Sequence, residues 1–123
     1  MRESGEDYLE TIYLLSRKQS DVHCSDVAAK LGFSKPSVTR AVGILRAAGF
    51  IGIDSEKHIM LTQAGFKKAE EIAERHKTIT QFWVLNGVDA GIAEKDACRM
   101  EHDISEETFA AIKKIVEKSA LNT

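Results

Sequence analysis

The stretch Ser25-Asp-Val-Ala-Ala-Lys-Leu-Gly-Phe-Ser-Lys-Pro-Ser-Val-Thr39 decides the fold. A short helix is expected to begin after Ser25 and to end at Gly32, because glycine readily adopts the left-handed conformation of a helix C-cap. Ser34 is a suitable N-cap for a second helix. Pro36 falls in the first turn of that helix, where a missing N–H is harmless. The stretch therefore predicts two short helices joined by a tight turn.

Close packing of two such helices needs a small residue in the first, a residue that tolerates positive φ in the turn, and a buried aliphatic in the second. Ala28, Gly32 and Val38 supply these residue types in order. Residues 50–53 and 58–61 are short apolar segments on either side of a polar tip, which predicts a β-hairpin, although the tip lacks glycine. The fold class expected is mostly α with a small two-stranded wing, a winged helix-turn-helix.

The second helix of the pair is expected to read DNA. Its apolar face carries Val38, Val42 and Leu45, and its outer face carries Arg40. A recognition helix enters the major groove with its N-terminal half, where arginine can pair with guanine or hold a phosphate. Hydroxyl and lysine side chains suit phosphate contacts, which position the protein. The predicted DNA-binding residues are Ser34, Lys35, Pro36, Ser37, Thr39, Arg40 and, at the hairpin tip, Lys57. A helical hairpin with a solvated basic face is the alternative, and Ser34 could act only as a cap.

Charge is distributed unevenly along a chain whose net charge is only -2. Residues 24–50 hold four basic residues and one acidic residue, whereas residues 94–107 hold six acidic and two basic residues. Separate basic and acidic segments indicate two partners of opposite charge.

Further helices are expected on both sides of the winged helix. One should span about residues 5–17, and three more should follow Thr62, Asp89 and Ser105, each of which can cap a helix. We therefore expect a winged helix-turn-helix DNA-binding domain at residues 1–62 and a helical metal-binding and dimerisation domain at residues 63–123.

No apolar run approaches the ~20 residues needed to cross a bilayer, and the N-terminus lacks the apolar segment of a signal peptide. A cytoplasmic location is the expectation. In a reducing cytosol Cys24 and Cys98 are not expected to form a structural disulfide. Each is expected to be either a small buried side chain or a metal ligand.

A transition-metal site is predicted from three helices. Cys98, Glu101 and His102 share one helical face, because they are spaced i, i+3, i+4. A thiolate, a carboxylate and an imidazole together suit a transition metal. Further candidates are Asp7 and Glu10 on the first helix and His76 within an apolar stripe of the fourth. Each also has a structural interpretation: Asp7 as a capping acid, Glu10 as a solvated charge, His76 as a core histidine and Cys98 as a buried thiol.

These patterns resemble one family, the metal-responsive repressors represented by the diphtheria toxin repressor and the manganese transport regulator. The resemblance covers nearly the whole chain. It rests on residues 25–39 and on Glu6-Asp-Tyr-Leu-Glu-Thr-Ile-Tyr13, Leu61-Thr-x-x-Gly65, Arg75-His76 and Ala97-Cys-Arg-Met-Glu-His102. It implies a homodimer that binds a palindromic double-stranded DNA operator, with divalent Mn or Fe as co-repressor. The general order of divalent metal affinities indicates that Zn or Co should also bind in vitro.

The resemblance also implies a hybrid ligand set. Asp7, Glu10, His76, Glu101 and His102 match the manganese-type members, whereas Cys98 matches the iron-type members. Thr80 and Glu94 stand where the iron type carries a glutamate and a histidine, so the ancillary site of that type is not expected. Because the chain ends at Thr123, the short architecture without an SH3-like domain is expected.

The mechanism expected is a metal cross-link between the first helix and helices four and five, which holds the two recognition helices at the spacing of the DNA grooves. Two alternatives are a winged-helix regulator with a non-metal effector and one with a purely structural metal. A third is a metal-dependent hydrolase, for which the chain offers neither a nucleophile motif nor a phosphate-binding glycine loop.

Overall fold

The computed structural model describes residues 3–121, of which residues 3, 4 and 121 are described by their backbone alone. The elements follow the order α1 (Glu3–Lys18), α2 (Cys24–Leu31), α3 (Lys35–Ala47), β1 (Ile51–Ile53), β2 (Ile59–Leu61), α4 (Gln63–Leu85), α5 (Ala90–Asp103) and α6 (Glu106–Leu121). They form two compact units, which meet in the chain between Glu71 and Ile72, inside α4. Within residues 3–121, six helices and one hairpin confirm the predicted fold class.

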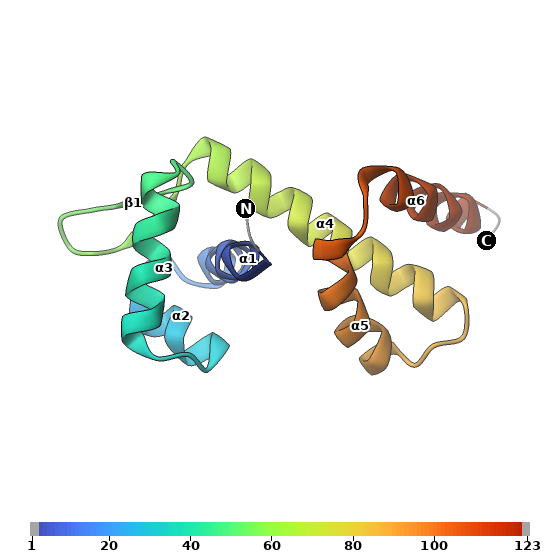
Figure 1. Cartoon of the computed structure of the whole chain (residues 1–123), viewed down its shortest axis with the longest axis horizontal. Helices are drawn as coiled ribbons and strands as arrows, with labels where there is room; N and C mark the ends of the chain where they lie inside the picture. The colour runs from blue at the N-terminus through green and yellow to red at the C-terminus, as the bar shows by residue number, and fades with distance from the viewer. Residues whose placement is uncertain (1–2, 122–123) are drawn as a thin grey trace. The chain divides into compact units, whose positions relative to one another are not determined.

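In the first unit, α1 packs against α2, α3 and β2 (Figure 1). The core is mainly aliphatic: Leu9, Ile12, Val27 and Val38 have no exposed surface. Strands β1 and β2 pair antiparallel, with Ile53 opposite Ile59. Such burial is the main stabilising contribution in a unit of this size.

The beginning of α2 corrects one expectation. The helix begins at Cys24, before Ser25, and its N-cap is His23. The carboxylate of Asp26 accepts a hydrogen bond from the His23 backbone N–H at 2.8 Å, which satisfies one of the free amides at the helix start. The predicted boundary is wrong because histidine is an uncommon N-cap, whereas serine is a common one.

In the second unit, the C-terminal part of α4 is followed by α5 and α6. Asp89 caps α5 by accepting from the amides of Gly91 and Ile92, and Ser105 caps α6 by accepting from the amide of Thr108. Buried small residues on α5, Ala93 and Ala97, leave room for neighbouring side chains. No described helix is long and apolar enough to cross a membrane.

Gly65 marks a close backbone approach at the start of α4. Thr62 accepts a hydrogen bond from the Gly65 amide at 3.1 Å, and its own hydroxyl donates to the Gly49 carbonyl at 2.7 Å. A Cβ at position 65 would collide with the backbone carbonyl of Phe50. Glycine is therefore required here by space.

We expect Gly65→Ala to lower the free energy of unfolding by about 1–3 kcal/mol, because the collision is with backbone that cannot rotate away. Gly43→Ala is the matched control, since no atom lies within 4 Å of a Cβ there. Alanine is the better helix former, so the control should be neutral or stabilising by up to about 1 kcal/mol. Urea denaturation measures both, and equal effects of the two substitutions would contradict this account.

Candidate DNA-reading element and metal centre

The turn between α2 and α3 has the geometry that the sequence predicted. Gly32 adopts a φ of 71°, in the left-handed region, and its N–H donates to the Ala28 carbonyl at 2.9 Å. Ser34 caps α3 by accepting from the Ser37 amide, and it also donates to the Ser37 hydroxyl at 2.8 Å. These bonds fix the angle at which α3 leaves the turn.

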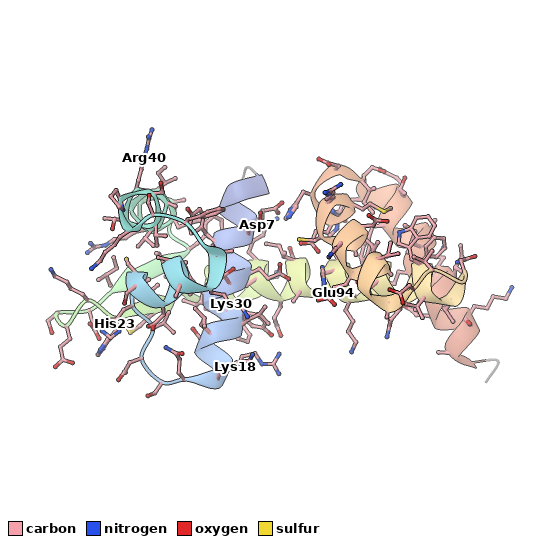
Figure 2. All side chains as sticks on the ribbon, turned by 90° about the horizontal axis from the view of Figure 1, so that it is seen from below. Asp7, Lys18, His23, Lys30, Arg40 and Glu94 are labelled. Carbon is pink, nitrogen blue, oxygen red and sulfur yellow. The ribbon has the colours of Figure 1, made fainter. Side chains whose placement is uncertain are left out.

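The two faces of α3 are those predicted. Val38, Val42 and Leu45 are at most 3% exposed. Arg40 is exposed, and Figure 2 shows its side chain projecting from α3 away from the unit's core. All six candidate DNA-binding residues at α3 are accessible, namely Ser34, Lys35, Pro36, Ser37, Thr39 and Arg40.

The hairpin tip forms a tight turn without glycine, and Asp54 explains how. One carboxylate oxygen of Asp54 accepts from the backbone amides of Glu56 and His58, at 2.9 and 2.8 Å. Lys57 itself adopts the left-handed conformation, with a φ of 65°. The exposed Lys57 is thereby presented at the tip, where the sequence placed it.

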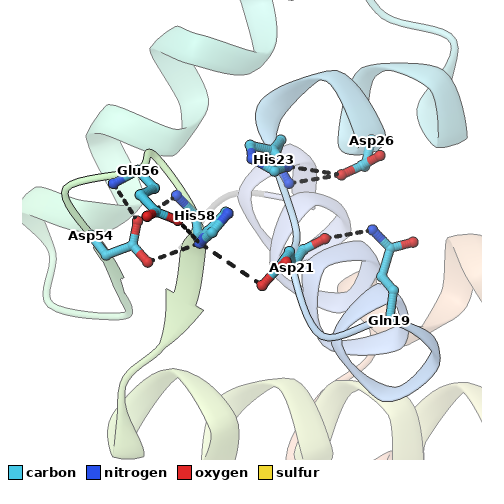
Figure 3. A network of polar contacts seen from close by, with 7 residues as sticks. All are labelled: Gln19, Asp21, His23, Asp26, Asp54, Glu56 and His58. Atoms are coloured by element: carbon cyan, nitrogen blue, oxygen red, sulfur yellow. Dashed lines mark hydrogen bonds and ion pairs between the residues drawn. The ribbon is translucent and has the colours of Figure 1, made fainter.

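A polar network holds the base of the hairpin to the segment before α2 (Figure 3). The His58 ring nitrogen Nδ1 lies 3.0 Å from Asp54 and 3.9 Å from Asp21. The His58 ring also packs edge-on against the ring of His23, and the Ile59 amide donates to the Val22 carbonyl at 2.7 Å. Sequence reasoning missed this network, because its partners are up to 37 residues apart (Asp21 to His58) and form no local pattern.

In the second unit, α4 and α5 bring three of the predicted metal ligands together. Ligand atoms of His76, Cys98 and Glu101 lie within 4.8 Å of one another. His76 Nδ1 is 3.0 Å from Glu101 Oε2, and His102 Nε2 is 3.4 Å from Glu101 Oε1. Cys98 is exposed, so it is not the buried structural thiol that was the alternative interpretation. Cys24 is half-buried in the first unit.

Glu101 provides the physical test of whether a cation fits. Its side chain is only 1% exposed, and Oε1 has no hydrogen-bond partner among the described residues. The His102 nitrogen is close enough for an ion pair, but its geometry is not that of a hydrogen bond. A buried carboxylate without full compensation is costly. A divalent cation beside the carboxylate, imidazole and thiol groups would supply the missing positive charge.

Arg75 supports the cluster of His76, Cys98 and Glu101. In the sequence, Arg75 was identified only as part of the Arg75-His76 motif. Its guanidinium donates to the Glu101 backbone carbonyl at 2.6 Å and to the carbonyls of Ile104 and Ser105 at 3.4 Å. It also stacks on the Phe109 ring at 5.0 Å. Arg75 thus satisfies carbonyls at the end of α5, next to the turn that carries Glu101.

Two residues at the edge of the centre differ from the iron-type pattern. Thr80 donates its hydroxyl to the His76 backbone carbonyl at 2.7 Å, a role within α4. Glu94 is largely exposed, with Oε1 4.0 Å from His76 Nε2. The remaining candidates, Asp7 and Glu10, are half-buried and lie three residues apart on α1 in the first unit.

A winged helix-turn-helix with a transition-metal ligand set defines a class, the metal-responsive DNA-binding regulators. Comparison with known families agrees with this assignment. Residues 1–59 match the iron dependent repressor, N-terminal DNA binding domain, and residues 62–121 match the iron dependent repressor, metal binding and dimerisation domain.

Known proteins show the same likeness. The chain is 38% identical over 117 residues to the transcriptional regulator MntR of Escherichia coli, covering 95% of this chain and 76% of that protein. It is 33% identical over 120 residues to an uncharacterized HTH-type transcriptional regulator of Methanocaldococcus jannaschii, covering 96% of each. The chain belongs to the iron-dependent repressor family, whose members include MntR. It is a metal-dependent transcriptional regulator and not an enzyme.

Solved structures confirm the fold. The metal-dependent transcriptional regulator MtsR superposes with a TM-score of 0.85 at 24% identity, and the manganese regulator SloR with 0.80 at 26%. Each covers 92% of this chain, but this chain spans only 53% of either of them.

The wing turn generates a pH prediction. The pKa of Asp54 is held below its ordinary value of 3.8, first by the hydrogen bond from the His58 backbone amide and also by the Glu56 amide, with desolvation opposing. A lowered folded-state pKa stabilises the turn above the ordinary value, and this contribution is lost as pH falls through the lowered value. An NMR titration should show the Asp54 carboxyl changing below pH 3.8.

Two substitutions test whether the Asp54 carboxylate, and no other side chain of the hairpin tip, holds the turn. Asp54→Asn should accelerate hydrogen exchange of the His58 amide at neutral pH, because the charged acceptor is lost. Glu56→Gln should not, since the Glu56 side chain is 77% exposed and only its backbone amide binds Asp54. Titration of Asp54 at an ordinary value would show that the turn is not held in this way.

Proposed function

We propose that the protein is a homodimeric repressor that binds a palindromic operator when a divalent metal, Mn or Fe, is bound, and that it controls metal-uptake genes. The observation that carries the proposal is the buried Glu101 carboxylate, with an oxygen that lacks a hydrogen bond among the described residues, beside His76 and Cys98. A cytoplasmic location follows, because the protein needs access to DNA and a reduced Cys98.

The mixture of ligand types suits a divalent metal of intermediate hardness. Carboxylate oxygens suit Mn, whereas a thiolate favours softer ions such as Fe, Co or Zn. His76, Cys98, Glu101 and His102 would hold the cation from the second unit. Zn and Co are therefore expected to bind in vitro, while Mn or Fe serves in the cell.

We infer that Asp7 and Glu10 complete the ligand set from α1. Their i, i+3 spacing puts both carboxylates on one face of that helix. The cation would then tie the DNA-binding region, residues 1–62, to the metal-binding and dimerisation region, residues 63–123. The bound cation supplies the positive charge that offsets repulsion among these carboxylates. Metal and operator would each strengthen binding of the other by the same factor.

The second unit offers a surface for the partner subunit. Val84, Leu85, Ile92 and Ile115 are each more than 40% exposed. The C-terminal parts of α4 and α6 also line a cavity of about 360 Å³. Large exposed apolar surface of this kind marks an interface. A symmetric dimer would place two recognition helices about 34 Å apart, the spacing of successive major grooves.

The test is operator affinity as a function of metal. An operator is first selected from a random duplex library in the presence of Mn(II), and its affinity is then measured at fixed salt with Mn(II) or with chelator. We expect Mn(II) to tighten binding by about tenfold or more, the usual range of allosteric coupling. His76→Ala and Asp7→Asn should both weaken this response, because each removes a ligand.

Glu70→Gln is the matched control, since Glu70 is an exposed carboxylate of α4 outside the cluster. It should respond to Mn(II) as the wild type does. An operator affinity that Mn(II) leaves unchanged would contradict the proposal. Unfolding by chelator, instead of release of folded protein from DNA, would favour a purely structural metal.

A further inference from the structure

A second surface of the first unit lies between α3 and the hairpin. It is a cavity of about 650 Å³ that is lined by the start of α2, one face of α3 and the two ends of the hairpin loop. We call it the wing groove. Its lining residues are His23, Cys24, Ser25, Lys35, Thr39, Val42, Gly43, Arg46, Ile53 and Lys57.

The wing groove uses a different face of α3 from the one that presents Arg40. Lys35, Thr39, Gly43 and Arg46 follow one another at spacings of three or four residues, so they form a single row along the helix. A Cβ added at Gly43 would meet no atom within 4 Å, so the floor of the groove is open there. Another molecule's backbone could approach α3 closely at this point.

The charge of the groove is positive. Lys35, Arg46 and Lys57 contribute three cations from two elements, and no carboxylate is among the described lining residues. Three acids adjoin lining residues in the sequence, and each has a partner of its own. Asp26 accepts from the His23 backbone amide, Asp54 accepts from the amides of the hairpin tip, and Glu56 Oε2 lies 3.9 Å from His58 Nδ1. An elongated anion is therefore the ligand whose charge complements the groove.

We propose that the wing groove holds the sugar-phosphate backbone of duplex DNA and that Arg46 is a phosphate-binding residue. The proposal rests on the DNA-binding function proposed above and extends it to a residue outside the predicted recognition set. An arginine can donate two hydrogen bonds to one phosphate, and hydroxyls such as those of Ser25 and Thr39 commonly accompany such contacts. Arg40, on the neighbouring face, remains free to read bases.

The groove also explains why the hairpin is fixed so firmly. Lys57 can hold a phosphate opposite Arg46 only if the tip keeps its position. The Asp54 turn and the contacts of His58 with Asp21 and His23 provide that rigidity (Figure 3). Preorganised cations bind a backbone with less loss of conformational entropy.

The test measures the salt dependence of binding to a random-sequence duplex in the presence of Mn(II), because phosphate contacts do not depend on sequence. Arg46→Ala should reduce the slope of log K against log salt by about one for each groove engaged. At ~0.1 M salt this corresponds to about eightfold weaker binding per groove. Arg46→Lys should keep the wild-type slope, because the positive charge remains.

Lys30→Ala is the control, since Lys30 is an exposed cation of α2 outside the groove lining (Figure 2). It should change the slope less than Arg46→Ala. Arg46 is exposed, and Arg46→Gln is a second neutral variant with a side chain close in length. Neutral variants with the slope of Lys30→Ala would overturn the proposal. A wild type that binds no duplex with Mn(II) would instead contradict the DNA-binding function itself.

Discussion

The buried carboxylate of Glu101 is the constraint on which the regulatory part of the molecule depends. Only 1% of that side chain is exposed, and its Oε1 accepts no hydrogen bond from the residues that the structure describes. A carboxylate in such a place is costly to bury without a positively charged partner. Arg75 holds the backbone of the same residue and does not neutralise its side chain. A cation bound beside Glu101 would offset the cost of burying its carboxylate.

The DNA-binding unit follows a different physical rule. Its core is mainly aliphatic, and its polar groups fix local geometry: Ser34 sets the start of α3, and Asp54 builds the wing turn. The basic side chains then lie on a rigid scaffold, Arg40 on one face of α3 and Arg46 on another. The two units therefore differ in chemistry: the first presents exposed basic side chains, and the second holds the cluster of His76, Cys98 and Glu101.

Much of the fold was predictable because its signals are local. The caps Ser34, Asp89 and Ser105 and the turn residue Gly32 act within four residues of their partners, and the structure confirms each of them. The clustering of His76, Cys98 and Glu101 was also inferred, from helical spacing and from family resemblance.

What the sequence did not reveal is non-local. Arg75 reaches carbonyls 26 to 30 residues away, and Asp21 meets His58 only through folding. The start of α2 was missed because its N-cap is His23, an uncommon cap residue, whose backbone N–H donates to the Asp26 carboxylate. Turn propensity alone would place glycine at a position with positive φ. Lys57 adopts this conformation because a neighbouring carboxylate supports the turn.

The most direct test of the central claim is the stability of the wild type and of Glu101→Gln, measured by urea denaturation in chelator and then with excess Mn(II). In chelator the variant should be at least as stable as the wild type, because a neutral amide is cheaper to bury. With Mn(II) at about 100 times its dissociation constant, the wild type should gain about 2.7 kcal/mol and the variant much less. A wild type that gains nothing, or a variant that gains as much, would contradict the account.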